Sequence, residues 1–206
     1  FINIDNELKS KCICIKCDLT NKDDVTKSTN KVVNQFGGID ILISNSGSAF
    51  QGQMKDLDEK ILENSMANNF YSHHYIIQEV VKIMINQSFG GSISINLSKQ
   101  SINPGNNFGP YGIAKASALF MMKQYALECG KYNIRINGVN ADRIQSGLLT
   151  KEMITQRAKA RGIKESDYLK NNLLNKEVTA TDVAESFFVQ LLLEKTTANI
   201  ITVDGG

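Results

Sequence analysis

The chain has 206 residues, of which 42% are hydrophobic and 21% charged, with a formal net charge of +2. This length and balance predict one globular domain over residues 1–206, and a near-neutral chain gives no reason to expect a nucleic acid as partner. Tryptophan is absent and no apolar run approaches the ~20 residues of a membrane span, so neither a base-stacking surface nor a membrane partner is expected.

Cysteine usage bears on redox environment and on metals. Cys12, Cys14 and Cys17 fall in one short run that predicts a buried strand, and Cys129 lies far away in sequence. Small buried thiols explain the run better than a disulfide framework does. A soft-metal site is the alternative, but no histidine or fourth cysteine lies nearby, so we expect no metal. Reduced cysteines fit a cytoplasmic protein.

Short apolar runs alternate with amphipathic stretches along the chain. Strands are expected at residues 12–16, 39–44, 92–97, 134–139 and 199–203. Helices are expected at residues 21–36, 58–87, 111–129 and 181–193, the last capped by Thr179 or Thr181. The strand at 39–44 is almost entirely apolar, which predicts burial on both faces. This alternation predicts an α/β fold: a doubly wound parallel sheet in a Rossmann-like, three-layer αβα arrangement.

Small or polar residues follow each of the first four predicted strands. Ligands of such sheets bind at the carboxyl ends of the strands, so these residues predict a site along one edge. They are Asp18, Asn45-Ser46-Gly47, Ser98 and Asn140-Ala141-Asp142.

Tyr111 and Lys115 lie four residues apart at the start of a predicted helix. Ser98 lies thirteen residues before Tyr111, at the end of a predicted strand. At this spacing the phenol and the ammonium share one face of the helix. The cation favours the phenolate and should lower a pKa that is ordinarily about 10, which gives a proton donor usable near neutral pH. Ser98 can hold a substrate oxygen in front of the pair; Ser94 and Ser101 fit that spacing less well. The alternative is an amphipathic helix with a surface lysine.

These residues resemble the short-chain dehydrogenase/reductase family from about residue 16 to residue 206. Seven blocks match in order and spacing. They are Asp18-Leu19-Thr20, the run from Gly38 to Gly47, Asn69, the strand ending in Ser98, Tyr111 with Lys115, the run from Ile134 to Val139, and Val203-Asp204-Gly205-Gly206.

The resemblance implies NAD or NADP as cofactor, with NAD favoured, and hydride transfer between nicotinamide and a small carbonyl, secondary alcohol or hydroxy-aldehyde. It implies Tyr111 as general acid/base, Lys115 as its electrostatic partner and ribose ligand, and Ser98 as the residue that positions the substrate oxygen. It also implies that Asn69 supports a relay water, although a helix cap or kink could explain Asn69 or Asn68. The cofactor-binding residues that it implies are Asp18, Leu19, Asn45, Ser46, Gly47, Tyr111, Lys115 and Ile144.

Other residues keep two interpretations. Asp18 could cap the following helix as well as bind the adenine end of the cofactor. Asp142 is either a ligand contact or a turn residue. His73 and His74 lie in a long predicted helix, far in sequence from every strand end, and are expected to be exposed or at an interface. In the family, helices such as 58–87 and 111–129 form the subunit contact, so a homodimer or homotetramer is expected.

The resemblance also assigns residues 147–174 to a substrate lid. Its basic residues could meet an acidic group, but an ordinary solvated face is the favoured interpretation. They are Arg157, Lys159 and Arg161.

Three departures from the family pattern stand out. Ser44 and Ser46 replace an asparagine and an alanine, and Ala141-Asp142 replaces Pro-Gly. No Gly-x-x-x-Gly-x-Gly turn precedes Cys12, so the first βαβ unit is expected to be lacking and the chain to be an amino-terminally truncated copy of a longer enzyme. The strand at 12–16 would then have no neighbour, and the strand at 39–44 would present an open, apolar edge.

Finer motifs resemble the dehydrogenase half of bifunctional class II aldolase/short-chain dehydrogenase proteins. They include Asn103-Pro104-Gly105, Ser146-Gly147-Leu148-Leu149 and Glu194-Lys195-Thr196-Thr197. The opposing interpretation of the whole chain is a non-catalytic binding or scaffold protein, or an inactive fragment.

Overall fold

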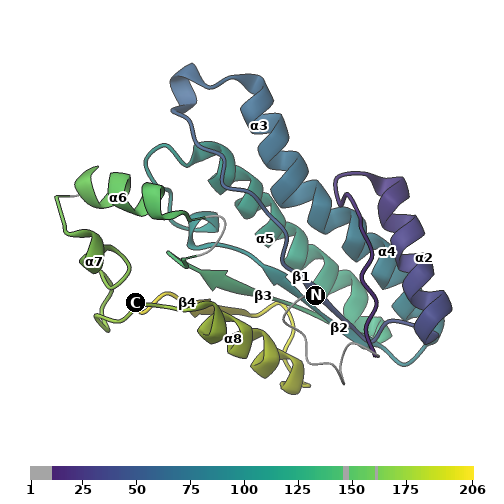
Figure 1. Ribbon diagram of the computed structural model, residues 1–206. Helices are drawn as coiled ribbons and strands as arrows, with labels where there is room; N and C mark the ends of the chain where they lie inside the picture. Colours follow the sequence, from purple (N-terminus) through teal and green to yellow (C-terminus); the bar gives the residue numbers. More distant parts are fainter. Residues whose placement is uncertain (1–10, 146–148, 161) are drawn as a thin grey trace.

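The computed structural model describes residues 11–145, 149–160 and 162–206 (Figure 1). Four strands form one parallel sheet in the order β1-β2-β3-β4, with Ile41 opposite Ser92, Gly91 opposite Ile134 and Gly138 opposite Ile200. The predicted parallel sheet is confirmed. Its strands are β1 (Ile41–Ser44), β2 (Gly91–Asn96), β3 (Ile134–Ala141) and β4 (Ile200–Val203).

Helices lie on both sides of this sheet. The helices α4 and α5 pack over one face, α8 packs against the other, and α2 lies outside α4 (Figure 1). The short helices α6 and α7 lie beyond the carboxyl ends of the strands. The bounds are α2 (Lys22–Phe36), α3 (Glu59–Met66), α4 (Ser72–Gln87), α5 (Gly109–Cys129), α6 (Lys151–Ala160), α7 (Glu165–Tyr168) and α8 (Ala180–Leu192).

Capping residues set the ends of two helices. The side chain of Asn21 accepts hydrogen bonds from the backbone N–H groups of Asp23 and Asp24, and α2 ends at Gly37, whose φ is 85°. Thr179 and Asp182 form a reciprocal capping box at the start of α8. Thr179, rather than Thr181, is therefore the cap.

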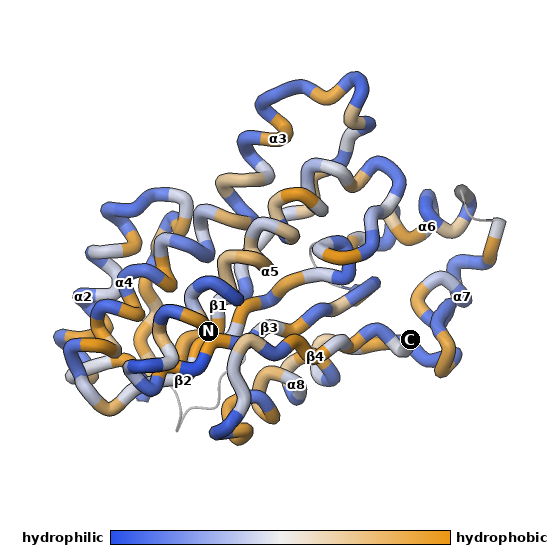
Figure 2. Tube along the Cα trace, turned by 180° about the vertical axis from the view of Figure 1, so that it is seen from behind, coloured by the Kyte–Doolittle hydropathy of each residue, from blue (hydrophilic) through white to orange (hydrophobic). Residues whose placement is uncertain are grey.

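One long helix runs from α3 into α4, as predicted for residues 58–87. A π-helical turn over Ala67–Tyr71 joins the two parts, with Asn69 fully buried inside it. A π-turn widens the helix by one residue and re-aims side chains, and such turns are frequent at functional sites. Figure 2 shows hydrophilic residues along much of the projecting α3.

Two apolar clusters fill the spaces on either side of the sheet. Ile93 and Ile95 of β2, with Ile134 and Ile136 of β3, are buried beneath α4 and α5. On the opposite face Val139 packs with Val183 and Phe187 of α8. Arg135 donates hydrogen bonds to the last carbonyl groups of α8 and its neighbours, which fixes that helix at the amino ends of the strands.

Two expectations for the amino-terminal part of the sheet were wrong. Residues 12–16 form no strand, because a strand exists only through hydrogen bonds to a neighbour and nothing in the described part of the chain pairs with them. Cys12 and Cys14 are consequently exposed rather than buried. Nor is β1 buried on both faces: it lies at the sheet edge, where Ile41 is 51% and Ile43 40% exposed. The structure does have the open, apolar edge that was expected at this strand.

None of the helices in the described residues combines the length and the apolar composition required to cross a bilayer.

Candidate functional site

Ser98, Tyr111 and Lys115 meet at the carboxyl end of β2. Ser98 follows β2 and caps a short turn, while α5 begins at Gly109 with Pro110 in its first turn and carries Tyr111 and Lys115 on successive turns. The side chain of Ser98 acts on the Tyr111 phenol and favours its ionised form, and Lys115 Nζ lies 5.9 Å from the centre of the Tyr111 ring. The grouping predicted from spacing is therefore present.

The pKa of Tyr111 departs from its ordinary value in the direction opposite to the one expected. Burial raises it, the interaction with the Ser98 side chain works against that rise, and the charge of Asp142 adds to it. The expected lowering fails because Lys115 Nζ is directed at other partners and not at the phenol oxygen.

Lys115 is a buried cation, with 3% of its surface exposed. Its Nζ donates a hydrogen bond of 2.7 Å to the carbonyl of Asn96 and lies 3.3 Å from His73 Nε2. In the described part of the chain no carboxylate forms an ion pair with it. Burial lowers the pKa of Lys115 to about 7, so its charge can change near neutral pH.

Asn69 ties the loop after β1 to the long helix. Its Nδ2 donates to the carbonyls of Ser48 at 2.8 Å and Ser65 at 3.1 Å, and its Oδ1 accepts from the Ser48 N–H at 3.1 Å. A Cβ at Gly47 would lie 2.8 Å from Asn69 Oδ1 and 3.5 Å from Lys115 Nζ, so this position needs glycine. Asn68 and Asn69 both lie in the π-turn, and the side chain of Asn68 donates to the helix carbonyl of Asn64.

Unpaired polar atoms collect at the carboxyl edge of the sheet. Asn96 Nδ2 donates to Asn45 Oδ1 across the ends of β1 and β2, at 2.6 Å. The buried oxygens Ser46 Oγ, Asn96 Oδ1 and Asn140 Oδ1 have no hydrogen-bond partner among the described residues. Buried polar groups are normally paired, so this edge has unused capacity for a polar ligand.

The predicted adenine-end residues Asp18 and Leu19 lie just before α2. Asp18 is exposed, and its Oδ1 accepts hydrogen bonds from the N–H of Thr20 at 2.9 Å and its hydroxyl at 2.7 Å, which lower the pKa of Asp18. The capping role belongs to Asn21 instead. Leu19 is partly buried, and Ile144 packs against the cluster around Val139.

Asp142 acts on Tyr111, since its charge raises the pKa of the phenol. It pairs with Arg143 at 3.0 Å, and the guanidinium of Arg143 lies 5.9 Å from the ring centre of Tyr168 in α7. Through the contact between Arg143 and Tyr168, the end of β3 is tied to α7.

The predicted lid is described in part. Residues 146–148 and 161 lie outside the described residues, and with them Arg161. Lys159 is exposed, as a solvated face requires. Arg157 is not: its guanidinium lies 4.7 Å from the ring centre of Phe108, just before α5. A cation over an aromatic face is attracted to it, which draws α6 toward the start of α5.

His73 was expected to be exposed or at an interface, and that expectation was wrong. It is fully buried, with Nδ1 2.7 Å from Ser44 Oγ and Nε2 3.3 Å from Lys115 Nζ. Burial and the charge of Lys115 hold its pKa well below the usual range. Sequence distance from the strand ends concealed this contact, because α4 packs along the sheet and returns His73 to the end of β1.

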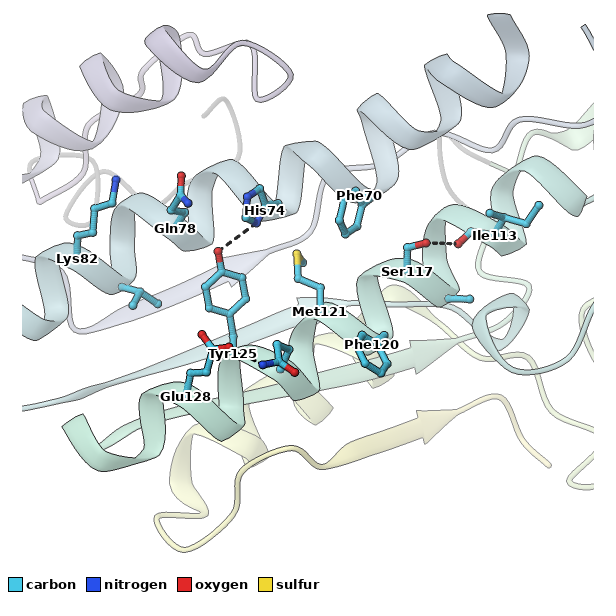
Figure 3. Close-up of a pocket in the computed structure, with 13 residues that line it drawn as sticks. Phe70, His74, Gln78, Lys82, Ile113, Ser117, Phe120, Met121, Tyr125 and Glu128 are labelled. Carbon is cyan, nitrogen blue, oxygen red and sulfur yellow. Dashed lines mark hydrogen bonds between the residues drawn. The ribbon is translucent and has the colours of Figure 1, made fainter. Parts of the chain in front are cut away.

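A separate groove of about 910 Å³ runs between the outer sides of α4 and α5 (Figure 3). Phe70, His74 and Tyr125 line it, and Tyr125 Oη lies 3.0 Å from His74 Nδ1. Phe120, also in its wall, is 71% exposed. None of the catalytic candidates lines this groove, so it is a second surface and not the reaction site.

The comparisons with known proteins agree with the geometry. The family model described as "Enoyl-(Acyl carrier protein) reductase" matches residues 2–206. The chain belongs to the short-chain dehydrogenase/reductase family. A relative, the uncharacterized oxidoreductase YuxG of Bacillus subtilis (strain 168), is 31% identical over 206 residues, which are 96% of this chain and 30% of that protein. The chain spans between 46% and 58% of the length of three further relatives.

Solved structures share the fold. Sorbitol-6-phosphate 2-dehydrogenase SrlD from Erwinia amylovora superposes with a TM-score of 0.86 at 21% identity, covering 93% of this chain and 77% of that one. A 7α-hydroxysteroid dehydrogenase complexed with NADH and 7-oxo glycochenodeoxycholic acid gives a TM-score of 0.81 at 23% identity, covering 93% and 72%. At this level of identity the likeness establishes the Rossmann-like fold of the family.

Proposed function

We propose that the chain carries the catalytic residues of an NAD(P)-dependent oxidoreductase that interconverts a small carbonyl compound, such as a hydroxy-aldehyde, and its alcohol. The observation that carries this proposal is that the phenol of Tyr111 lies within interaction range of the Ser98 side chain, next to the buried ammonium of Lys115. A hydroxyl and a phenol so placed can hold one substrate oxygen between them and move a proton on or off it.

In this proposal, residues at the strand ends would contact a dinucleotide at its adenine end and at its nicotinamide end. The unpaired oxygens of Ser46 and Asn140 can accept hydrogen bonds from ligand hydroxyl or amide groups, and Gly47 leaves room beside Lys115. Asp18 and Leu19 would hold the adenine end, while Asn45, Ile144 and Lys115 would line the nicotinamide end. NAD(P), when bound, supplies or accepts the hydride. NAD is the favoured form, and a structural relative is complexed with NADH.

The protein's own contribution is orientation and proton control. Ser98 positions the substrate oxygen, and Tyr111 gives or takes the oxygen's proton. Since burial raises the pKa of Tyr111, the phenol is protonated at neutral pH and suited to donate in the direction of carbonyl reduction. Lys115 stabilises the phenolate left behind, and Asn69 holds the loop that borders the site and supports a water that links Lys115 to solvent.

Tyr111→Phe tests the proposal. NADH and NADPH oxidation should be followed with a panel of small hydroxy-aldehydes and ketones, and the substitution should reduce turnover by at least about 100-fold, since it removes the proton donor. Tyr132→Phe is the matched control, because Tyr132 is 41% exposed at the far end of α5. Turnover that survives Tyr111→Phe would overturn the assignment. A wild-type chain without turnover would favour a binding or scaffold protein, or an inactive fragment.

We further propose that the groove between α4 and α5 is a contact between copies of this chain, giving a homodimer or homotetramer. Support comes from Phe120, Ile113 and Leu127 on the outer side of α5, which are 71%, 42% and 78% exposed. Apolar side chains gathered in this way mark association surfaces. His74, half-buried in the groove wall, would then be an interface residue.

Kinship to the dehydrogenase half of bifunctional class II aldolase/short-chain dehydrogenase proteins is also proposed. It is supported by the Bacillus relative, of which this chain matches 30%. The cysteines of the described chain are unpaired, which suits the cytoplasm.

A further inference from the structure

His73 joins three elements that border the proposed active site. It projects from α4, and its two ring nitrogens contact Ser44 at the end of β1 and Lys115 on α5, at 2.7 Å and 3.3 Å. Its exposed fraction is 0%. A titratable ring placed between a hydroxyl and a buried ammonium is not needed for packing alone, because an apolar side chain of similar volume would fill the same space.

The hydrogen-bond chemistry fixes the protonation pattern of this contact. A lysine ammonium has three N–H donors and no acceptor, so His73 Nε2 must accept. The ring proton then resides on Nδ1 and is donated to Ser44 Oγ, 2.7 Å away. A doubly protonated ring would turn an N–H toward the ammonium, which places two like charges together without water. His73 is thus neutral, consistent with a pKa well below its usual range.

Lys115 depends on neutral acceptors to keep its proton. The titratable groups that face it are His73 from α4 and Tyr111 from its own helix; Asp142, after β3, acts on Tyr111 and is paired with Arg143. Within the described ranges no carboxylate pairs with Lys115. The Asn96 carbonyl and His73 Nε2 are its close polar contacts, and a buried charge without a counter-ion is stabilised only by such hydrogen bonds.

We propose that His73 is a positioning residue that accepts a hydrogen bond from Lys115, holds its ammonium at the end of β2 and keeps it protonated beside Tyr111. Ser44 accepts a hydrogen bond from His73 Nδ1–H and so fixes the tautomer in which Nε2 can accept from Lys115. The catalytic consequence rests on the function proposed above, whereas the effect of His73 on Lys115 does not depend on it. The hydrogen-bonded chain therefore runs from Ser44 through His73 to Lys115, whose ammonium lies beside the Tyr111 ring.

The direct test is the titration of Lys115 in the apo chain, followed by NMR of lysine labelled with ¹³C at Cε, with Lys115→Met to assign the signal. A hydrogen bond to a charged group is worth about 1.5–3 kcal/mol, or about 1–2 pH units. His73→Leu should lower the Lys115 midpoint by about that amount. His73→Gln, whose amide oxygen can accept, should restore most of it. His74→Leu is the control on the same helix and should leave the midpoint in place.

Ser44→Ala provides a second route if His73→Leu fails to fold. It frees the ring to adopt the other tautomer and should shift the midpoint in the same direction by a smaller amount. A midpoint that is unchanged in His73→Leu, or unchanged in Ser44→Ala where His73→Leu is unfolded, overturns the proposal. So does a His73→Gln value equal to that of His73→Leu.

Turnover supplies the catalytic readout. If the chain oxidises NADH with a carbonyl substrate, the pH profile of kcat/KM, which reports the free enzyme, should shift by as much as the Lys115 midpoint in each variant. A midpoint that moves in a chain without turnover supports the role of His73 and counts against the proposed function. If the Lys115 midpoint shifts in a variant while the pH profile of turnover stays unchanged, the proposed effect of His73 on catalysis is contradicted.

Discussion

Asn69→Ala should cost far more stability than its position on a helix suggests. The substitution removes four hydrogen bonds, at 2.8, 3.1, 3.1 and 3.4 Å, and leaves the N–H and C=O of Ser48 without their partner. A neutral hydrogen bond contributes about 0.5–1.5 kcal/mol, and an orphaned buried group costs about 1–3 kcal/mol. Since Ser48 is partly buried and water can replace some of these bonds, we expect a loss of about 2–4 kcal/mol.

Asn68→Ala is the matched control, because its Nδ2 bonds only to the helix carbonyl of Asn64 on an exposed side. The gain in helix propensity from asparagine to alanine is common to both variants and cancels in the comparison. Asn68→Ala should change stability by about 0.5 kcal/mol or less. Urea unfolding followed by circular dichroism gives both values. A cost for Asn69→Ala below about 1 kcal/mol, or equal to that of Asn68→Ala, would refute the claim that Asn69 holds the loop.

Three further predictions concern charge, association and capping. Burial lowers the pKa of Lys115 to about 7, whereas the unfolded lysine titrates at about 10.4, so the unfolded chain binds more protons between these values. Unfolding free energy should therefore rise with pH from about 7, by up to about 1.4 kcal/mol per unit relative to Lys115→Met; parallel curves in urea would contradict this. Phe120→Asp should shift the sedimentation of an oligomer to that of a monomer, while Phe89→Asp, at 62% exposure, should not. Thr179→Ala should lower the melting temperature through a loss of about 1 kcal/mol, and an equal effect of Thr181→Ala would contradict the capping assignment.

The sheet and the main helices were predictable because local signals agreed with the fold. Alternation of apolar strands with amphipathic helices gave the parallel sheet, and Gly37 and Thr179 carried conformational signals that mark helix ends. The pairing of Ser98 with Tyr111 followed from spacing and from the rule that strand ends meet at one edge.

Features that depend on tertiary packing could not be predicted from the sequence. Residues 12–16 carry a strand pattern, but a strand needs a pairing partner, and pattern alone cannot supply one. The direction of the Tyr111 pKa shift depends on where Lys115 Nζ is aimed, and that is decided by the Asn96 carbonyl and by His73. His73 reaches the site only because the helix that carries it packs along the sheet, which no local spacing reveals.

The central claim, that Tyr111 works beside a dinucleotide site, is tested most directly by melting the 206-residue chain with and without millimolar NADH and NADPH. Ligand at ten times its Kd stabilises a protein by about 1.4 kcal/mol, which corresponds to a rise of about 3–6 °C for a domain of this size. We expect one cofactor to give such a rise and Gly47→Val, whose side chain would crowd Asn69 and Lys115, to abolish it. A cooperative melt that neither cofactor moves would contradict the account.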